Sequence, residues 1–325
     1  METPLTTWYL PAADPGGGHV FDGRRGRALT AEEGEYAATL VDAAGQCAAI
    51  TGDGEFMLEV PGPDAVTRRY RGQTNSTTSG QVYVLREQPP QLPAFDNDGL
   101  PIPANVQKWM LHGALRTGGL VLFLGPGGAG KTTTASAMIV ERLRAFGGVA
   151  VTAEKPAEYA IGGSHGDGYC LQTEVEAGEG YGAAVRRALR CYPANSGSGL
   201  LFIGEIRDPD EAAEALVSGA NGNLVLATMH ADGLVSGLKR LVLLAAKRLG
   251  VEAAYDQLGT TLRLAFYQVL ENRVLRVRVL QTLESAQQGK GLRERIKAGQ
   301  LDSIAGDLES VNRRTRPDIS TGRGR

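Results

Sequence analysis

A glycine-rich segment between an apolar run and a helical stretch constrains this fold more than any other feature. Residues 125–132 read GPGGAGKT and fit the spacing G-x-x-x-x-G-K-[ST] in full. The run before them, 121–124, is typical of a buried strand, and 133–146 is typical of a helix. The chain's 44 glycines make a chance match easier, but a strand, a glycine loop and a helix together predict a phosphate-binding loop.

The residue types of this loop predict that it binds ATP with Mg²⁺. Glycines let the backbone turn its N–H groups toward phosphate oxygens, and the start of the following helix adds positive potential. Lys131 is expected to reach the β- and γ-phosphates, and the Thr132 hydroxyl to bind Mg²⁺. The predicted nucleotide-binding residues in this segment are Gly125, Gly127, Gly128, Ala129, Gly130, Lys131, Thr132 and Thr133.

The chain divides into zones of different pattern. Apolar runs alternate with helical stretches over 106–305, which predicts an α/β ATPase domain with a parallel sheet and C-terminal helices. Residues 31–87 predict a small α+β domain, and the proline-rich 88–105 predicts a linker because proline removes backbone donors. Residues 1–30 are rich in Gly and Pro and are expected to form a flexible arm, and 306–325 a disordered basic tail.

Charge, apolar stretches and cysteines limit which partners and which cellular location are expected. The net charge of −2 makes no general case for nucleic acid or anionic membrane as a partner. No apolar stretch approaches 18 residues, and the N-terminus lacks the pattern of a signal peptide. Cys47, Cys170 and Cys191 are far apart and lack metal-site spacing, which favours free thiols. We therefore expect a cytoplasmic protein, and any membrane role must come through a partner.

A second segment supplies the acidic group that a phosphate-binding loop needs. Residues 200–208 read LLFIGEIRD, an apolar strand followed by Glu205. Ligands and catalytic groups gather at strand ends in open α/β sheets. Taken alone, Glu205 is explained equally well as a surface glutamate at the end of a strand.

Several motifs together resemble the ATPase superfamily of type II and type IV secretion systems, which includes pilus motors. They are the phosphate-binding loop, AAVRRALRCYP at 183–193, GEIRD at 204–208 and LVLATMH at 224–230. The resemblance covers roughly residues 69–300, and pilus-retraction (PilT-like) or conjugative type IV members are the nearest branches. It implies an α/β fold: a RecA-like P-loop NTPase core with a small N-terminal α+β (PAS-like) domain.

The resemblance also implies three catalytic residues. Glu205 would position or deprotonate the attacking water. Glu154 opens EKPAE at 154–158, where the family usually has E-D-P-[IV]-E, and would assist the metal and the water. His230 ends the family's His box and would sense the γ-phosphate or relay to the next subunit. The alternative for His230 is a structural role, which is more common for a lone histidine after an apolar run.

Arginines at family positions form a further set. Arg71 and Arg86 match arginines of the family's N-terminal domain and are expected to contact the phosphates. Ordinary exposed strand arginines are the alternative. Arg186, Arg190 and Arg207 also match family positions, with interdomain or intersubunit salt bridges as the alternative to contact with ATP.

The chain also departs from the family pattern. Lys155 stands where an aspartate is usual, Asn223 stands where the first His-box histidine is usual, and 191–199 lengthens a loop. Because the phosphate-binding loop and Glu205 are kept, we expect hydrolysis, slowed by these changes. Residues 262–270 and 291–299 resemble two family helices and are expected to serve packing and interfaces.

The sequence thus predicts an ATP-hydrolysing motor that powers pilus retraction or assembly, or type IV (conjugative) secretion. The resemblance implies a homo-hexamer that acts on an inner-membrane platform protein of a pilus or secretion machine. A nucleotide-binding scaffold of the same fold with little hydrolysis is the first alternative. A nucleic-acid motor is the second, and the nearly neutral charge gives no strong nucleic-acid signal.

Overall fold

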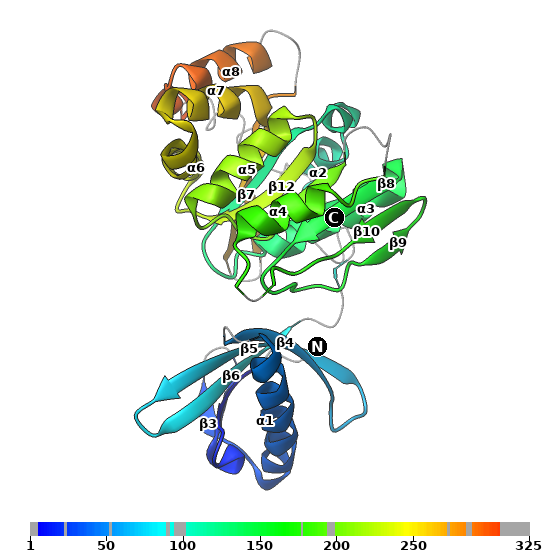
Figure 1. Cartoon of the computed structure of the whole chain (residues 1–325), viewed down its shortest axis with the longest axis vertical. Coiled ribbons are helices and arrows are strands. Elements are labelled where there is room, and N and C mark those ends of the chain that lie inside the picture. Colours follow the sequence, from blue (N-terminus) through cyan, green and yellow to red (C-terminus); the bar gives the residue numbers. More distant parts are fainter. Residues whose placement is uncertain are drawn as a thin grey trace, which may run out of the picture. The chain divides into compact units, whose positions relative to one another are not determined.

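The described residues form two compact units (Figure 1). The computed structural model describes residues 6–22, 25–51, 54–88, 92–93, 102–176, 178–193, 199–271, 274–283 and 288–305. The first unit comprises Met1–Leu92, Lys155–Ala160 and Glu174–Glu179. The second comprises Pro93–Glu154, Ile161–Thr173 and Gly180–Arg325. The predicted linker at 88–105 lies largely outside the described residues, and the predicted tail at 306–325 lies wholly outside them.

The first unit is an antiparallel sheet packed against a long helix. Within the described residues its six strands lie in the order β3-β2-β1-β6-β5-β4. The strands are β1 (Thr7–Pro11), β2 (His19–Phe21), β3 (Gly26–Ala28), β4 (Glu55–Pro61), β5 (Thr67–Thr77) and β6 (Gly80–Gln88), and a 3-10 turn occupies Pro15–Gly17. Helix α1 (Ala31–Thr51) buries Tyr36, Ala37, Leu40 and Ala44, one helical face, against the core of this unit.

The prediction of a flexible arm over 1–30 is wrong for the residues of this stretch that the structure describes. Strand β1 pairs with β6 along five residues, with Trp8 opposite Leu85. Trp8 and Leu10 alternate along β1 and are buried in the core. The glycines and prolines that suggested an arm are concentrated in the turn after β1, so composition concealed a short alternating strand.

The second unit is a mixed, largely parallel sheet with helices packed on it. Among the described residues its eight strands lie in the order β14-β13-β7-β12-β11-β8-β10-β9. The strands are β7 (Gly119–Gly125), β8 (Gly148–Ala153), β9 (Gly163–His165), β10 (Gly168–Leu171), β11 (Leu200–Ile203), β12 (Leu224–His230), β13 (Leu262–Glu271) and β14 (Val274–Gln281). The helices are α2 (Ala104–Met110), α3 (Lys131–Phe146), α4 (Tyr181–Leu189), α5 (Pro209–Ala220), α6 (Leu234–Leu249), α7 (Val251–Thr261) and α8 (Gln288–Lys297). Short 3-10 helices occupy Gly113–Thr117 and Leu301–Ile304.

The centre of this sheet consists of strands buried on both faces. Every residue of β7 is buried, and β11 is buried throughout. Continuous apolar runs of this kind are typical of parallel strands covered by helices on both sides. Helices α4 and α5 lie in front of the sheet in Figure 1, and α6, α7 and α8 pack one against the next beside α5.

The family-based prediction of a helix at 262–270 is wrong, because these residues form strand β13. It pairs in parallel with β7 and antiparallel with β14. Buried apolar side chains at Leu262, Leu264, Ala265 and Phe266 fit a strand that is covered on both faces, which periodicity alone does not separate from a buried helix. The helix predicted at 291–299 is confirmed as α8, which begins three residues earlier.

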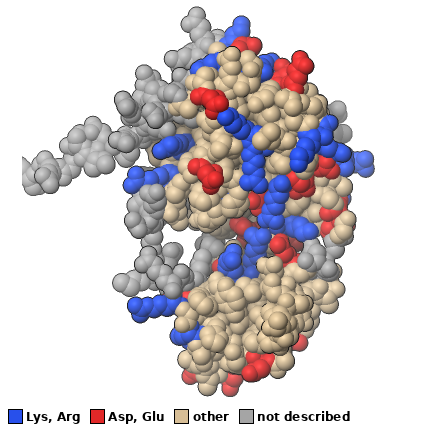
Figure 2. Space-filling view, turned by 90° about the vertical axis from the view of Figure 1, so that its left-hand side faces the viewer, with Lys and Arg blue, Asp and Glu red and all other residues tan. Residues whose placement is uncertain are grey.

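Two predictions from composition agree with the structure. No helix of the described residues has the length and apolar character needed to span a bilayer. Cys47, Cys170 and Cys191 are free thiols. On the face shown in Figure 2, Lys and Arg side chains lie next to Asp and Glu side chains, in keeping with the small net charge.

Gly118 is expected to be among the least replaceable residues of this fold. Its φ is +85°, and an added Cβ would lie 2.2 Å from the backbone oxygen of Gly222. Gly250 has the same φ, but a Cβ there would meet nothing within 4 Å. Gly118→Ala should therefore lower the free energy of unfolding by about 1–3 kcal/mol more than Gly250→Ala, since both share the backbone strain and only one adds a clash. Equal shifts of the denaturation midpoint in the two variants would contradict this.

Candidate nucleotide site

The parallel sheet brings the predicted site residues to one edge. Strands β7, β12, β11 and β8 are neighbours in this order and all run in the same direction. The phosphate-binding loop follows β7, His230 ends β12, Glu205 follows β11 and Glu154 follows β8. Carboxyl ends of parallel strands meet at the same edge, where open α/β sheets bind ligands. Residues up to 105 positions apart in the sequence thus become neighbours in space.

The loop depends on glycine at positions that include Gly125 and Gly130. Gly125 has φ +153°, and a Cβ there would lie 2.2 Å from the backbone oxygen of Gln268. Gly130 has φ +77° and precedes the first residue of α3, and its helix start has no side-chain cap. The backbone N–H groups of such a helix start are available to an anion. Thr132 and Thr133 follow in the first turn of α3.

Lys131 lies against the backbone of the loop that precedes it. Its side chain is 8% exposed, and its Nζ donates hydrogen bonds to the carbonyl oxygens of Gly125 (3.0 Å) and Pro126 (2.9 Å). An ammonium group carries three donors and rotates freely at the end of a flexible stem. The charge is therefore held at the loop by neutral acceptors.

Glu205 and His230 meet beside this loop. Glu205 accepts hydrogen bonds on Oε2 from Arg207, with Nε at 2.8 Å and a terminal guanidinium nitrogen at 2.6 Å. His230 Nε2 lies 3.7 Å from Glu205 Oε1. A Cβ added at Gly127 would lie 3.3 Å from His230 Cε1, so the imidazole also borders the loop. The structure therefore places His230 between the predicted catalytic carboxylate and the predicted phosphate site.

Glu154 is a buried carboxylate at the end of β8. It is 2% exposed, and Gln172 Nε2 donates a hydrogen bond to its Oε1 (2.9 Å). The neighbouring strand end comes close because Gly204 has no side chain: a Cβ there would lie 3.2 Å from Glu154 Cα. Gln172 escaped the sequence analysis because it belongs to no recognisable motif.

Arg71 and Arg86 lie in the first unit, directly opposite each other on β5 and β6. Like charges in that position repel, and Arg71 is paired with Glu158 (3.1 Å) and Glu55 (3.7 Å). Arg69 donates to the Glu158 backbone oxygen (3.1 Å). Arg71, Arg86 and Glu55 also line a cavity of about 150 Å³. Their contact with a nucleotide stays a prediction.

A known protein family matches most of this chain. A family described as "Type II/IV secretion system protein" matches residues 48–293, about three quarters of the chain. The chain belongs to the type II/IV secretion system protein family. The family resemblance seen in the sequence is thereby confirmed.

Two curated relatives match part of this chain and a smaller part of their own length. The secretion-family chain is 38% identical over 142 residues to the type II secretion system protein HxcR of Pseudomonas aeruginosa, covering 42% of this chain and 28% of HxcR. It is 31% identical over 162 residues to the type IV pilus ATPase PilU of the same organism, covering 49% of this chain and 38% of PilU. The chain therefore spans well under half the length of these relatives.

A solved structure confirms the predicted α/β fold. The crystal structure of the pilus retraction motor PilT with bound ADP superposes with a TM-score of 0.73 at 24% identity. The match covers 97% of this chain and 88% of that one. At this identity the likeness establishes the shared fold of the family and nothing about the ligands of this chain.

Two departures from the family pattern, Asn223 and the lengthened loop at 191–199, can be located in the structure. Asn223 precedes β12, at the other end of this seven-residue strand from His230, roughly 20 Å away at about 3.3 Å per residue. Its Oδ1 accepts a hydrogen bond from Gly199 N (3.3 Å). Asn223 is therefore remote from the loop, and its effect on hydrolysis stays a prediction. In the lengthened loop at 191–199, residues 194–198 lie outside the described residues.

Two of the other family arginines, Arg186 and Arg207, form ion pairs inside the second unit. Arg186 of α4 pairs with Glu214 of α5, and Arg207 pairs with Glu205. The ion pair of Arg186 joins two neighbouring helices and does not involve the phosphate-binding loop. The pair on Arg207, by contrast, acts on the predicted catalytic carboxylate itself.

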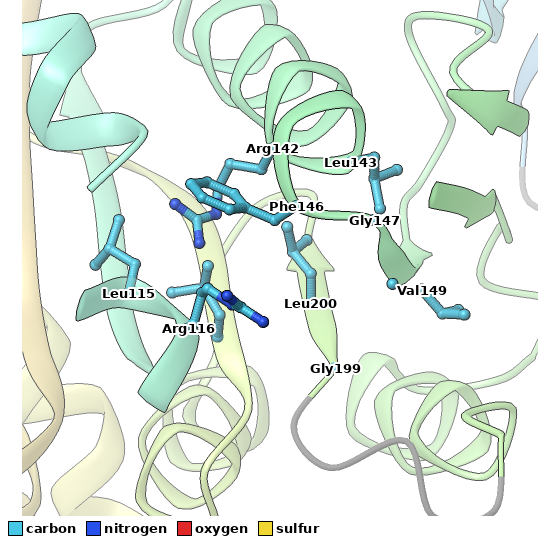
Figure 3. A pocket seen from close by; sticks show the side chains of 11 residues that line it. Leu115, Arg116, Arg142, Leu143, Phe146, Gly147, Val149, Gly199 and Leu200 are labelled. Atoms are coloured by element: carbon cyan, nitrogen blue, oxygen red, sulfur yellow. The ribbon is translucent and has the colours of Figure 1, made fainter. Parts of the chain in front are cut away.

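A cavity of about 320 Å³ opens at the opposite edge of this secretion-family sheet, at the amino ends of β8, β11 and β12. Figure 3 shows Arg142 beside the Phe146 ring, with its guanidinium carbon 4.8 Å from the ring centroid. Arg142 is buried and donates to the carbonyls of Met110 (2.9 Å), the last residue of α2, and of His112 (3.4 Å), just after this helix. Burial and the nearby Arg116 lower the pKa of Arg142 to about 10, so it stays charged at neutral pH. These bonds give the arginine a structural role far from the loop.

Glu211 links the Glu205 segment to helix α5. It is 1% exposed and accepts hydrogen bonds from the backbone N–H groups of Arg207 and Asp208, completing a capping box with the Asp208 side chain. Burial raises the pKa of this carboxyl to about 7, against an ordinary value of 4.5. The start of α5, with its N-cap at Asp208 shortly after Glu205, therefore depends on the Glu211 carboxyl group, whose pKa is about 7.

Glu211→Gln should make stability less dependent on pH. Between pH 4.5 and 7 the unfolded chain releases this proton while the folded chain keeps it, so rising pH destabilises the wild type across this window. Glutamine can accept the same backbone bonds without titrating. The variant should therefore gain on the wild type by about 2–3 kcal/mol between pH 4.5 and 7.

Melting temperatures measured across that pH range test this expectation. Glu252→Gln, on the exposed side of α7, controls for the removal of one negative charge. A melting difference between Glu211→Gln and wild type that stays constant with pH would contradict the shifted pKa.

Proposed function

We propose that this chain is an ATP-hydrolysing motor that drives a pilus or a type II or type IV secretion machine. The observation that carries the proposal is the meeting of the phosphate-binding loop, His230, Glu205 and Glu154 at the ends of four neighbouring parallel strands. A phosphate-binding loop alone would support nucleotide binding. The carboxylate beside it adds a group that can act on water.

The residues at this edge of the sheet have different roles in the proposed hydrolysis. Loop N–H groups and Lys131 bind the phosphates of ATP, which requires the ammonium to exchange its bonds with Gly125 and Pro126 for phosphate oxygens. Glu205 accepts the proton of the attacking water or orients it. The guanidinium of Arg207 holds this carboxylate in place before it acts.

The donor set at this edge also fits Mg²⁺. A hydroxyl at Thr132 and a carboxylate at Glu154 are oxygen ligands of the kind that Mg²⁺ prefers, used together with substrate phosphates and water. The bound ion would neutralise charge on the β- and γ-phosphates. His230, which borders both the loop and Glu205, is placed to sense the γ-phosphate.

The biological setting is inferred from the relatives. HxcR is named a type II secretion system protein and PilU a type IV pilus ATPase, and the solved PilT structure contains ADP. We infer for this chain a homo-hexameric ring on the cytoplasmic side of the inner membrane, bound to a platform protein of such a machine. Arg71 and Arg86 would contribute positive charge toward the phosphates in the working ring.

Steady-state ATP hydrolysis with Mg²⁺ tests the catalytic assignment. Glu205→Gln should lower kcat by about 10²–10⁴-fold while ATP still binds, because a general base contributes about that much. Lys131→Ala should abolish both binding and turnover. Glu252→Gln, an exposed glutamate on α7, is the matched control and should keep wild-type turnover.

The alternative to the motor has a distinct outcome in the same assay. Wild-type protein that binds ATP through Lys131 but does not turn it over would favour the nucleotide-binding scaffold. Turnover that survives Glu205→Gln would remove Glu205 from its proposed role while leaving the ATPase intact.

Ring formation is a separate expectation. Light scattering in the presence of Mg²⁺ and ATP should give a mass about six times that of the 34.3 kDa chain, and Glu205→Gln should hold this assembly longer by slowing hydrolysis. A wild-type protein that hydrolyses ATP as a monomer at micromolar concentration would contradict the ring.

A further inference from the structure

Strand β13 places a glutamine beside the point where β7 becomes the phosphate-binding loop. β13 flanks β7 on the side opposite β12, and its Phe266 and Tyr267 lie opposite Phe123 and Leu124 of β7. Gln268 comes next along the strand. Its backbone oxygen lies 2.2 Å from the point that a Cβ at Gly125 would occupy, so the two chains approach closely here.

The Gln268 side chain is fully buried and bonds to the loop from beneath. Its Nε2 donates to the Ala129 carbonyl oxygen (2.8 Å) and to Thr134 Oγ1 (3.1 Å). The Thr134 hydroxyl donates its own proton to the Gly130 oxygen (3.0 Å) and so accepts from the glutamine. A carbonyl can only accept. Both partners therefore require the nitrogen of the amide on this side.

The other end of the same amide offsets part of the stability that these two bonds provide. Gln268 Oε1 is buried without a hydrogen-bond partner in the part of the chain that the structure describes. An unpaired buried amide oxygen is destabilising. A methionine or leucine of similar size would remove the unpaired oxygen but would leave the buried Ala129 carbonyl without this donor. What Gln268 adds is therefore the pair of bonds from its nitrogen.

Those bonds orient the peptide groups on both sides of Gly130. In a planar trans peptide the C=O of Ala129 and the N–H of Gly130 point in opposite directions. Because Gln268 holds the Ala129 oxygen on the buried side, the Gly130 N–H faces away from the glutamine. The Gly130 oxygen is held in turn by the hydroxyl and the backbone N–H of Thr134.

We propose that Gln268 is a positioning residue for the phosphate-binding loop, which it preorganises by fixing the peptide planes that flank Gly130. The inference rests on the proposed nucleotide-binding function of that loop. N–H donors that already point at the anion bind it without reorganisation. The same bonds tie the loop to the first turn of α3, where Thr132 and Lys131 lie.

Amide hydrogen exchange in the nucleotide-free full chain tests the anchoring directly. Gln268→Met keeps the side-chain length and removes both donors. Its loop, residues 125–134, should exchange about tenfold faster than in the wild type, because local opening loses two hydrogen bonds. The melting temperature of Gln268→Met should change little, because removal of the unpaired oxygen offsets loss of the donor to the buried Ala129 carbonyl.

Affinity for Mg·ADP, measured by calorimetry, tests the consequence for the ligand. The Kd of Gln268→Met should rise about tenfold. Phe266→Leu is the matched control: it lies two residues earlier on β13 and stacks on Phe123 with ring centroids 5.1 Å apart. This control should lower the melting temperature and leave the Kd and the loop exchange as in the wild type.

Thr134→Val supplies a second variant should Gln268→Met fail to fold. It removes the shared hydroxyl, should weaken Mg·ADP binding, and in a double variant should add little to the effect of Gln268→Met. Loop exchange and Kd within twofold of the wild type in folded Gln268→Met or, should that not fold, in Thr134→Val would overturn the proposal. Absence of Mg·ADP binding in the wild type would instead overturn the proposed function, while the exchange comparison still decides the anchoring.

Discussion

The parallel pairing of β7 with β12 and β13 is the constraint on which the rest of the second unit depends. Hydrogen bonds between strands set which residues end level with one another, and here they align Gly125 with His230 of β12 on one side and bring Gln268 of β13 beside Gly125 on the other. The next strands, β11 and β8, extend the same alignment to Glu205 and Glu154. A slip of one residue in any pair would turn a predicted site side chain to the other face of the sheet.

Several buried polar groups at this edge are held by specific partners. Lys131 donates to loop carbonyls, Glu154 accepts from Gln172, and the Thr228 hydroxyl donates to the Gly204 carbonyl (2.6 Å). Such groups would destabilise an apolar core if unpaired. Paired, they fix the loop and the strand ends in one arrangement. The unpaired oxygen of Gln268 is an exception that coincides with the loop, where function and stability make different demands.

At this edge the glycines matter because they let neighbouring chain segments come close together, more than because they are flexible. Gly125, Gly127 and Gly204 each lie where a Cβ would press on Gln268, His230 or Glu154. The strands can end close together only because these positions have no side chain. The spacing of glycines in GPGGAGKT was legible in the sequence, but what each glycine lies against was not, because the neighbours come from strands 50 to 140 residues away.

The sequence by itself determined the loop, the strand and helix that frame it, the family, and the candidate acid at Glu205, since these are local patterns with a fixed spacing. It failed at 1–30 and at 262–270, where composition or a buried apolar run does not distinguish strand from arm or helix. Only the tertiary structure decided that Asn223 lies far from the loop, that Arg207 holds Glu205, and that Gln268 supports the loop. These contacts depend on strand order and register, which no local pattern specifies.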